Sequence, residues 1–518
     1  MIKVKRALVS CWDKAGLLDF ARGLHTIGIE MITTGGTSRF LKSMNVPVQE
    51  VSDYTGFPEI LDGRVKTLHP KIHAGLLALR DHPEHIKQLE HHGIPPIDMI
   101  VVNLYPFERV IARKNVSLPE ALENLDIGGV ALLRSAAKNF KSVAVVCNPQ
   151  RYQDILKELN QNSGILSDKV LINLAVEAFG LTSHYEATIY NFLNNRLKGG
   201  EFGGLPQDLT LRFTKIRDLR YGENPHQAAA FYREREESKG LSKMKQRHGK
   251  ELSFNNILDF HAAVQMIKDF PDPSAVIIKH TNPTGVAEDK TLARAYRYAW
   301  ACDRISSYGG IIGLNRKVDL PTAKLIFKSG FMEGVIAPAY APAAFQVLAQ
   351  KKNIRLIELD WKDLTDSASD FKPVLGGLLF QESDQKKLEA SSLKVATKIK
   401  PTALQASSLL FGWKIIKHVK SNAILLIKGR RTVGIGCGQT SRIDATAIAI
   451  RKAGKNARGA VMISEAFLPK TDNVRLAAKA GIKAIIQTGG SLSDPDVIQE
   501  ANKAAIAMVM TGMRHFKH

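Results

Sequence analysis

Short apolar runs that alternate with helix-like segments are the feature that most constrains the fold of this chain. Runs at residues 4–9, 29–33, 98–103 and 142–147 have the length and composition of buried strands, and helix-like segments separate them. This alternation predicts a mostly parallel sheet, because parallel neighbours need a crossover connection. Ligands of such sheets bind beyond the carboxyl ends of the strands, so functional residues are expected in the turns there.

The length of the chain predicts more than one domain. A chain of 518 residues is too long for a single core, and its 44% hydrophobic and 24% charged residues are ordinary for a globular protein. A glycine-rich stretch at 199–204 is the best linker, so we expect a first domain at 1–198 and a second part at 199–518. That second part is long enough for two lobes, although it shows no sequence repeat. Residues 351–372 are charged and are expected to be peripheral.

Several classes of protein are disfavoured by composition. No uninterrupted run of 18 apolar residues occurs, so no transmembrane helix is expected. The first ten residues are typical of a strand and too polar for a signal peptide, which favours a cytoplasmic protein. The four cysteines are far apart and form no Cys-x-x-Cys pair, which argues against a disulfide framework and a cysteine-rich zinc site.

The net charge of +22 fits an anionic partner such as nucleic acid, a phosphorylated small molecule or a polycarboxylate. The lysines and arginines are scattered, however, and the densest run, at 243–250, accompanies no nucleic-acid-binding signature. We therefore expect a small-molecule substrate and no nucleic-acid partner.

Two stretches of the first domain suit an anionic ligand. The Thr-Gly-Gly-Thr turn at 34–37 joins a strand to a helix, where backbone N–H groups can bind phosphate, although such glycines also serve turn geometry alone. The loop at 53–73 is rich in functional groups. Within it Arg64, Lys66 and Thr67 suit an anionic substrate, although the loop also fits a solvated surface.

In the second part, a buried strand at 275–279 ends in the adjacent pair Lys279 and His280. Adjacent strand residues point to opposite faces, so the two share one substrate across a bend or serve different groups. A lysine at a strand end beside a partly buried histidine is the alternative. The glycines at 434–438 do not open a βαβ unit, so no dinucleotide site is expected. The tail at 511–518 holds arginine, phenylalanine and histidine and is expected to be docked.

Motifs along essentially the whole chain resemble the family of bifunctional purine-biosynthesis enzymes. The motifs that resemble the family's IMP cyclohydrolase half are Val-Ser-x-x-Asp-Lys-x-Gly at 9–16, Thr-Gly-Gly-Thr at 34–37, Gly-Arg-Val-Lys-Thr-Leu-His-Pro at 63–70, Asn-Leu-Tyr-Pro-Phe at 103–107, Asp-Ile-Gly-Gly at 126–129 and Ala-Ala-Lys-Asn at 136–139. The motifs that resemble the family's AICAR transformylase half are Arg-Tyr-Gly-Glu-Asn-Pro-His-Gln at 220–227, Lys-His-Thr-Asn-Pro at 279–283, Lys-Ser-Asn-Ala at 420–423, Gln-Thr-Ser-Arg at 439–442 and Arg-His-Phe-Lys-His at 514–518.

This resemblance implies two consecutive reactions. The formyl group of 10-formyltetrahydrofolate, a folate co-substrate, moves to the 5-amino group of AICAR, and formyl-AICAR then closes its ring with loss of water to give IMP. The implied fold is α/β, with a methylglyoxal-synthase-like parallel-sheet domain followed by two cytidine-deaminase-like lobes without zinc. The implied assembly is an intertwined homodimer with transformylase sites at the subunit interface, and no metal is required.

The resemblance also implies roles for individual residues. In the transformylase, His280 is the base, Lys279 stabilises the oxyanion and Asn422 orients the formyl group. AICAR contacts are implied for Arg220, Tyr221, Gly309, Glu333, Arg442, Arg514 and Phe516, and folate contacts for Phe467 and Asp472.

In the cyclohydrolase, the implied catalytic residues are Lys66, Tyr105, Asp126 and Lys138, with Lys138 as proton donor and acceptor. Nucleotide contacts are implied for Lys14, Thr34, Gly35, Gly36, Thr37, Arg64, Thr67 and Asn103. The chain departs from the family pattern at Trp12, where a small serine is usual, and at Thr284, Glu465 and Lys470.

Overall fold

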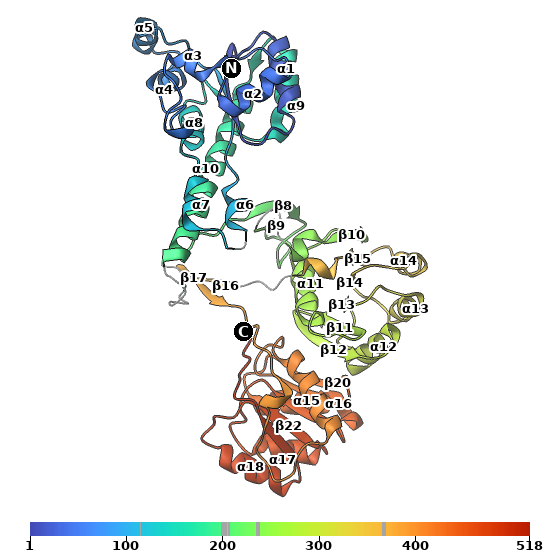
Figure 1. The fold of residues 1–518 in the computed structure, drawn as a ribbon. Coiled ribbons are helices and arrows are strands. Elements are labelled where there is room, and N and C mark those ends of the chain that lie inside the picture. The colour runs from blue at the N-terminus through green and yellow to red at the C-terminus, as the bar shows by residue number, and fades with distance from the viewer. Residues whose placement is uncertain (114, 198–204, 206–207, 235–238, 365–368) are drawn as a thin grey trace. The chain divides into compact units, whose positions relative to one another are not determined.

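The computed structural model divides the chain into two compact units, Met1–Thr210 and Leu211–His518 (Figure 1). It describes every residue except 114, 198–204, 206–207, 235–238 and 365–368. The linker expected at 199–204 therefore lies outside the described residues.

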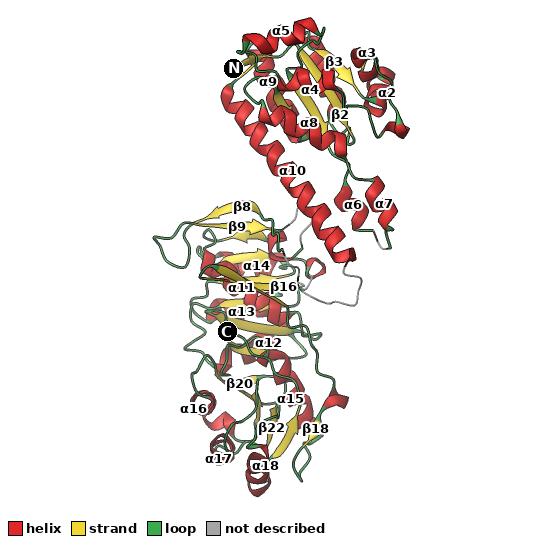
Figure 2. Cartoon of the chain, turned by 90° about the vertical axis from the view of Figure 1, so that its left-hand side faces the viewer, coloured by secondary structure: helices red, strands yellow, loops and turns green. Residues whose placement is uncertain are grey.

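The first unit is built on a five-stranded sheet in which all neighbouring strands are parallel, as the sequence predicts. In spatial order its strands are β4 (Gln49–Glu50), β3 (Glu30–Thr33), β2 (Arg6–Cys11), β5 (Met99–Asn103) and β6 (Ala144–Val146). The helices are α1 (Leu17–Thr26), α2 (Gly35–Ser43), α3 (Val51–Thr55), α4 (Pro70–Leu77), α5 (Pro83–His91), α6 (Phe107–Ile111), α7 (Leu118–Glu123), α8 (Ile127–Lys138), α9 (Tyr152–Gln161) and α10 (Asp168–Leu197). Figure 2 shows α4 and α8 against the sheet, whereas α6 and α7 lie beside the far part of α10.

Residues 151–197 have a helical sequence pattern, but the structure interrupts it. Between α9 and α10, β7 (Ile165–Leu166) pairs antiparallel with β1 (Ile2–Lys3). The two-residue strand is too short to produce a visible pattern in the sequence. None of the helices among the described residues is both long and apolar enough to cross a membrane.

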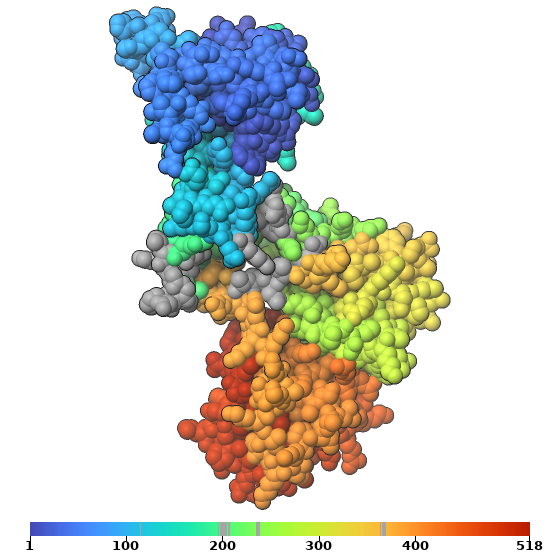
Figure 3. Space-filling view, viewed as in Figure 1, coloured from blue at the N-terminus to red at the C-terminus, as the bar shows by residue number. Residues whose placement is uncertain are grey.

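The second unit contains two lobes with the same strand order, which explains its length (Figure 3). The first lobe orders its strands β10 (Lys245–His248), β15 (Arg355–Glu358), β14 (Gly334–Ala337), β13 (Ile311–Leu314), β11 (Ser274–Lys279) and β12 (Asn282–Glu288). The second orders them β18 (Lys394–Val395), β23 (Ala507–Met510), β22 (Ala484–Gln487), β21 (Val461–Ser464), β19 (Ile424–Ile427) and β20 (Thr432–Gly436). Two separate hairpins accompany the lobes, β8 (Thr214–Leu219) with β9 (Ala229–Arg233), and β16 (Ser369–Val374) with β17 (Gly377–Glu382).

The helices repeat in the same order. The first lobe has α11 (Phe254–Ile267), α12 (Leu292–Cys302), α13 (Leu320–Lys328) and α14 (Pro342–Ala349), and the second has α15 (Ala403–Ile416), α16 (Arg442–Ala453), α17 (Asp472–Lys479) and α18 (Asp494–Lys503). Both α11 and α15 run for 14 residues and begin with a capping box, formed by Ser253 with Asn256 and by Thr402 with Gln405. The repeat conserves the pattern of apolar and capping positions more than the residues themselves, so it escapes notice in the sequence.

The lobes meet through the edge strands β12 and β20. The Val286 N–H donates to Thr432 Oγ1 over 2.9 Å, and the Glu288 N–H donates to the Arg430 carbonyl over 3.0 Å. At Gly285 and at Gly434, a side chain would collide with the backbone of the covering helix, α12 or α16. Glycine at these equivalent positions therefore lets each helix lie against its hairpin.

The expectation that residues 351–372 are peripheral is wrong for 355–358. These residues form β15, which lies inside the sheet between β10 and β14. Arg355 is 7% exposed, and its guanidinium is paired with Glu333 and bonded to the Glu251 carbonyl. Paired and hydrogen-bonded charges can be buried, so a charged sequence does not by itself place a strand at the surface.

Candidate active sites

A cavity of about 860 Å³ opens at the carboxyl ends of the strands of the first unit. This is the edge at which a parallel sheet binds its ligands. Its lining includes these predicted site residues: Lys14, Thr34, Gly36, Thr37, Arg64, Lys66, Thr67, Asn103, Tyr105 and Asp126. Residues from distant parts of the sequence thus converge on one space.

The Thr-Gly-Gly-Thr turn forms the start of α2 beside this cavity. Thr34 precedes the helix without a side-chain cap bond, so the first N–H groups of α2 remain open to an anion. The Thr37 hydroxyl instead accepts from the Cys11 N–H at 3.1 Å, which ties α2 to the end of β2. The phosphate-binding interpretation therefore depends on backbone donors more than on both threonine hydroxyls.

Asn103 fixes the loop after β2. Its Oδ1 accepts from the Trp12 N–H at 2.6 Å and from the Asp13 N–H at 2.9 Å, and its Nδ2 donates to the Asp13 carbonyl at 2.8 Å. The Trp12 side chain is 46% exposed and lines the cavity. The larger side chain at this departure is thus accommodated at the cavity mouth without entering the core.

Two cations of the cavity, Arg64 and Lys66, are paired with carboxylates that were not predicted as site residues. Lys66 Nζ lies 2.9 Å from Glu59 Oε1, and Arg64 pairs with Glu123. A side chain at Gly63 would collide with both Glu59 and Lys66. An anionic substrate bound here would compete with these carboxylates for the same cations.

Asp126 is held at the start of α8. Its Oδ1 accepts from the Gly129 N–H at 2.7 Å, and its own N–H donates to the Tyr185 hydroxyl at 2.8 Å. Burial raises the pKa of Asp126, although the N–H groups of Gly129 and Tyr105 and the charge of Lys66 oppose the shift. A buried carboxyl group beside a lysine is a candidate for proton transfer to or from a substrate.

Lys138 does not border this cavity within one chain. It is the last residue of α8 and is exposed, whereas residues 127–129 at the first turn of that helix line the cavity. The helix has 12 residues, so its two ends are separated by about 18 Å at the usual rise of 1.5 Å per residue.

In the second unit, one group of predicted residues lies in the first lobe. Lys279 Nζ donates to the Tyr308 carbonyl at 2.7 Å, next to Gly309, and the Glu333 N–H donates to the Gly310 carbonyl at 3.0 Å. Lys279 ends β11 and His280 is the first residue of the two-residue turn into β12. Arg220 lies over the ring of Tyr221, 5.4 Å from its centroid, in the loop after β8.

A second group lies in the second lobe around a buried ion pair. Arg442 is 7% exposed and its guanidinium is 2.5 Å from Glu465, while its other amino group donates to Asn422 Oδ1 at 2.8 Å. Glu465 Oε1 also accepts from the Ser421 hydroxyl and from the Ala423 N–H. Glu465, one of the departures from the family pattern, therefore has partners for both carboxylate oxygens, and it helps to orient Asn422 through Arg442.

The other two departures have different surroundings. The Thr284 hydroxyl is buried and lies 2.9 Å from the Ser307 hydroxyl, so it serves the interior of the lobe. Lys470 is exposed near Phe467 and Asp472 in the sequence.

The carboxyl-terminal tail is docked, which confirms the sequence prediction. His515 is 2% exposed, its Nδ1 lies 2.5 Å from Asp384, and its N–H donates to the Glu465 carbonyl at 3.1 Å. Arg514 lies over the ring of Phe516, 4.3 Å from its centroid. The docking places Arg514 and Phe516 beside the lobe that holds Arg442.

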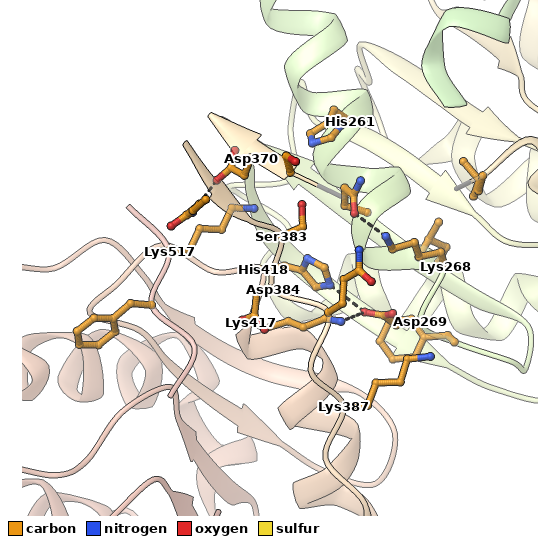
Figure 4. A pocket seen from close by; sticks show the side chains of 18 of the residues that line it. His261, Lys268, Asp269, Asp370, Ser383, Asp384, Lys387, Lys417, His418 and Lys517 are labelled. Carbon is orange, nitrogen blue, oxygen red and sulfur yellow. Dashed lines mark hydrogen bonds and ion pairs between the residues drawn. The ribbon is translucent and has the colours of Figure 1, made fainter. Parts of the chain in front are cut away.

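A cavity of about 1120 Å³ in the second unit contains a cluster of ionisable residues that was not predicted from the sequence (Figure 4). Asp269 lies 2.8 Å from Lys417 Nζ and 2.9 Å from His418 Nε2. Burial alone would raise the pKa of Asp269, but hydrogen bonds from His418 and Lys417 hold it at about 2. Burial lowers the pKa of His418 to about 4 against the opposing effect of Asp269.

No sequence spacing would have revealed this cluster, because about 150 residues separate its members and the folding of two lobes brings them together. Among the described residues that line this cavity, Phe516 is the only predicted site residue. Among the residues that the structure describes, no group of three or more His, Cys, Asp or Glu is arranged to hold a metal ion.

Comparison with known proteins agrees with this architecture. The model of the AICARFT/IMPCHase bienzyme family matches residues 136–452, and that of the MGS-like domain matches residues 16–131. The bifunctional purine biosynthesis protein PurH of Thermoanaerobacter sp. (strain X514) is 49% identical over 514 residues, which cover 99% of this chain and 100% of the relative. PurH of Magnetococcus marinus is also 49% identical, with 100% of both chains covered. The crystal structure of ForH matches 36% of this chain and 95% of its own at 32% identity, with a TM-score of 0.34.

The parallel-sheet unit, the two-lobed unit and the matches to the two family models and to PurH define a bifunctional enzyme of purine biosynthesis. The chain belongs to the AICARFT/IMPCHase bienzyme family. Its two activities are AICAR formyltransferase and IMP cyclohydrolase.

Proposed function

We propose that the two units divide these activities, with ring closure in the first unit and formyl transfer in the second. The observation that carries the proposal is the convergence of ten predicted nucleotide-binding and catalytic residues on the cavity of the first unit alone. The transformylase residues all lie in the second unit.

In the proposed ring closure, the carboxamide nitrogen of formyl-AICAR attacks the formamide carbon and loses one proton. The formamide nitrogen loses a second proton as the C–O bond breaks, and the formyl oxygen leaves with two protons as water. The start of α2 binds the phosphate, together with Lys14, Arg64 and Thr67. Lys66 and Tyr105 stabilise the oxyanion of the tetrahedral centre. Asp126, whose pKa is raised by burial, supplies a proton to the departing hydroxyl. IMP is the product.

In the proposed formyl transfer, the AICAR amine attacks the formyl carbon of 10-formyltetrahydrofolate. His280 accepts the amine proton, Lys279 stabilises the developing oxyanion and Asn422 orients the formyl group. Tetrahydrofolate leaves when the bond from its nitrogen to the formyl carbon breaks, and that nitrogen takes up the proton that His280 had accepted. Further AICAR contacts come from Arg220, Tyr221, Gly309, Glu333, Arg442, Arg514 and Phe516, and folate contacts from Phe467 and Asp472. The proposal uses no metal ion.

A homodimer is part of this proposal. In the first lobe, Ile305 is 90% and Tyr308 60% exposed close to Gly309, and on the β16–β17 hairpin Leu379 is 61% exposed and Leu375 fully so. A two-stranded hairpin with exposed apolar residues is marginal in water unless another surface covers it. We assign a second copy of the chain to that surface. Lys138 is proposed as the proton donor and acceptor of ring closure, although it does not line the cavity of its own chain.

We place the enzyme in the cytoplasm, with AICAR, formyl-AICAR, IMP and folate as its small-molecule partners and no nucleic-acid or membrane partner. The support is its membership of a family of metabolic enzymes. Substrates that carry phosphate and glutamate groups also suit a chain with a net charge of +22.

The test uses residues 1–210 and 211–518 as separate fragments, because these are the two compact units. Ring closure of supplied formyl-AICAR and formyl transfer to AICAR are each followed by ultraviolet absorbance. The first fragment is expected to close the ring without transferring formyl groups, and the second to do the reverse. A folded first fragment that regains ring closure only when the second is added would contradict the division.

A further inference from the structure

The turn that carries His280 has an unusual backbone. His280 has φ 53° and Thr281 has φ 62°, so two consecutive residues with side chains occupy the left-handed region. Hairpin turns with positive φ at both central residues strongly prefer Asn, Asp or Gly there, and a β-branched threonine is especially disfavoured. Something outside the turn must therefore hold it in this conformation.

The carboxylate of Asp259 makes contacts that do this. Asp259 lies on α11, and its two oxygens accept from the two strained residues, Oδ1 from the Thr281 N–H at 2.6 Å and Oδ2 from the His280 N–H at 3.3 Å. Burial raises the pKa of Asp259, whereas these two N–H groups lower it and so favour the ionised form that accepts both bonds. One side chain thus satisfies both N–H groups of the turn.

The second lobe supplies an internal comparison. Register pairs Lys279 with Asn282 across the first hairpin, and the corresponding turn of the β19–β20 hairpin runs from Lys428 to Arg431. Gly429 there occupies the position of His280, and its positive φ of 63° needs no support. Counting from the two helix caps, Ser253 and Thr402, the position of Asp259 is taken by Ser408, which bonds within its own helix to the Leu404 carbonyl.

We propose that Asp259 is the positioning residue that holds the His280–Thr281 turn in the conformation required for formyl transfer. The inference rests on the proposed role of His280 as the base. Asp259 itself contacts the backbone of the turn and does not react with the substrate. The aspartate occurs in the lobe in which the turn carries two side chains, and it is absent from the lobe in which glycine occupies the first position.

The first experiment compares Asp259→Ala, Asp259→Asn and the matched control Ser408→Ala in the full-length enzyme. Asp259→Ala is expected to lower kcat for formyl transfer about ten- to a hundredfold while KM for AICAR changes less than about threefold, because the turn is lost and the other AICAR contacts stay. Asp259→Asn keeps one acceptor and is expected to fall between Asp259→Ala and the unmodified enzyme. Ser408→Ala and the ring-closure activity of all three variants are expected to be unchanged.

The second experiment tests positioning directly by adding Thr281→Gly. Glycine adopts positive φ without strain, so Asp259→Ala with Thr281→Gly is expected to transfer formyl groups at least about threefold faster than Asp259→Ala alone. Thr281→Gly alone is expected to change the rate less than about threefold. A residue that acted on the substrate would not be replaced by a change in backbone preference, so failure of this rescue would overturn the positioning role.

Two further outcomes are distinguished by His280→Ala. If His280→Ala abolishes transfer and Asp259→Ala leaves kcat unchanged, the inference about Asp259 is wrong and the proposed base stands. If His280→Ala itself keeps near-normal transfer, the proposed base is wrong, and with it the role assigned to Asp259.

Discussion

The two lobes of the second unit share one strand order, yet the predicted transformylase residues lie at opposite ends of the parallel strands: at the amino ends in the first lobe and at the carboxyl ends in the second. In the first lobe, Gly309 and Glu333 precede the parallel strands β13 and β14, and Lys279 ends their antiparallel neighbour β11. In the second lobe, Phe467 and Arg514 follow the parallel strands β21 and β23. Repeating a fold therefore did not repeat its site.

Aligned residues at the carboxyl ends of β13 and β21 differ between the two lobes. The register aligns Glu465 of the second lobe with Asn315 of the first, and both accept a hydrogen bond from the start of the neighbouring strand, at Ala423 and Ser274 respectively. Glu465 also pairs with buried Arg442, whereas the first lobe has Leu292 at the first position of α12. The same structural bond was kept in both lobes, and the charged pair occurs in one. Substitutions at aligned positions can separate these two kinds of role.

The largest effect is expected at the two hairpin turns. His280→Ala should lower formyl transfer about a hundred- to ten-thousand-fold, the usual cost of losing a general base, and leave ring closure intact. The aligned control, Gly429→Ala, places a side chain at φ 63° and should cost about 1–2 kcal/mol of stability, but it should change transfer less than about twofold, since no atom lies within 4 Å of the added methyl group. Both reactions are measured by ultraviolet absorbance. Equal losses in the two variants would mean that the lobes contribute equivalent turns.

The buried carboxylate and its aligned amide are expected to differ in stability. Glu465→Ala leaves Arg442 buried without its partner and should cost about 3–5 kcal/mol. Asn315→Ala removes neutral hydrogen bonds and should cost about 1–3 kcal/mol. Urea unfolding of the two variants beside the unmodified protein gives both values. A larger loss for Asn315→Ala would remove the distinction between a charged and a purely structural position.

The tail provides a third aligned pair. Arg514 follows β23 at the position that Lys362 takes after β15. Arg514→Ala should reduce kcat/KM of formyl transfer about ten- to a hundredfold, the value of a hydrogen bond to a charged ligand group, and Lys362→Ala should have no effect. Point variants are preferable to deletion of the tail, because deletion would also remove the buried His515. Normal transfer by Arg514→Ala would make the tail a structural element only.

The smallest effect concerns the junction at which α11 and α15 end. Burial lowers the pKa of His418 to about 4 from the ordinary value of 6.5, so between these values the unfolded chain binds a proton that the folded chain does not. Stability should therefore fall as the pH drops from about 6.5 to about 4. His418→Gln should reduce that loss by about 1–2 kcal/mol, as measured by urea unfolding at pH 7 and pH 5. The exposed His226 offers a control, and an identical pH dependence for His418→Gln and His226→Gln would contradict the assignment.

Sequence patterns predicted well where the signal is local. The runs predicted at 4–9, 29–33, 98–103 and 142–147 begin within two residues of β2, β3, β5 and β6, because apolar β-branched runs bounded by turns contain most of the information for a buried strand. The two-residue strands β1, β4 and β7 were not predicted. The same reasoning failed for β15, in which Arg355 is buried through partners at Glu251 and Glu333 that no local pattern reveals. The turn at 34–37 and Arg64, Lys66 and Thr67 were named from the residues themselves and the other residues of the first cavity through resemblance, whereas their convergence came from the structure.

The sequence by itself determined the alternation of strands and helices, the expectation of a site at the carboxyl ends of the first sheet, and the family to which the motifs point. These follow from short-range patterns and from motifs that are read residue by residue. The tertiary structure alone decided at which strand ends each lobe holds its predicted transformylase residues. It also decided that Lys138 lies away from its own cavity and that Asp259 supports the turn of His280. Such facts depend on contacts between residues far apart in the chain, and a linear pattern does not encode the distance between them.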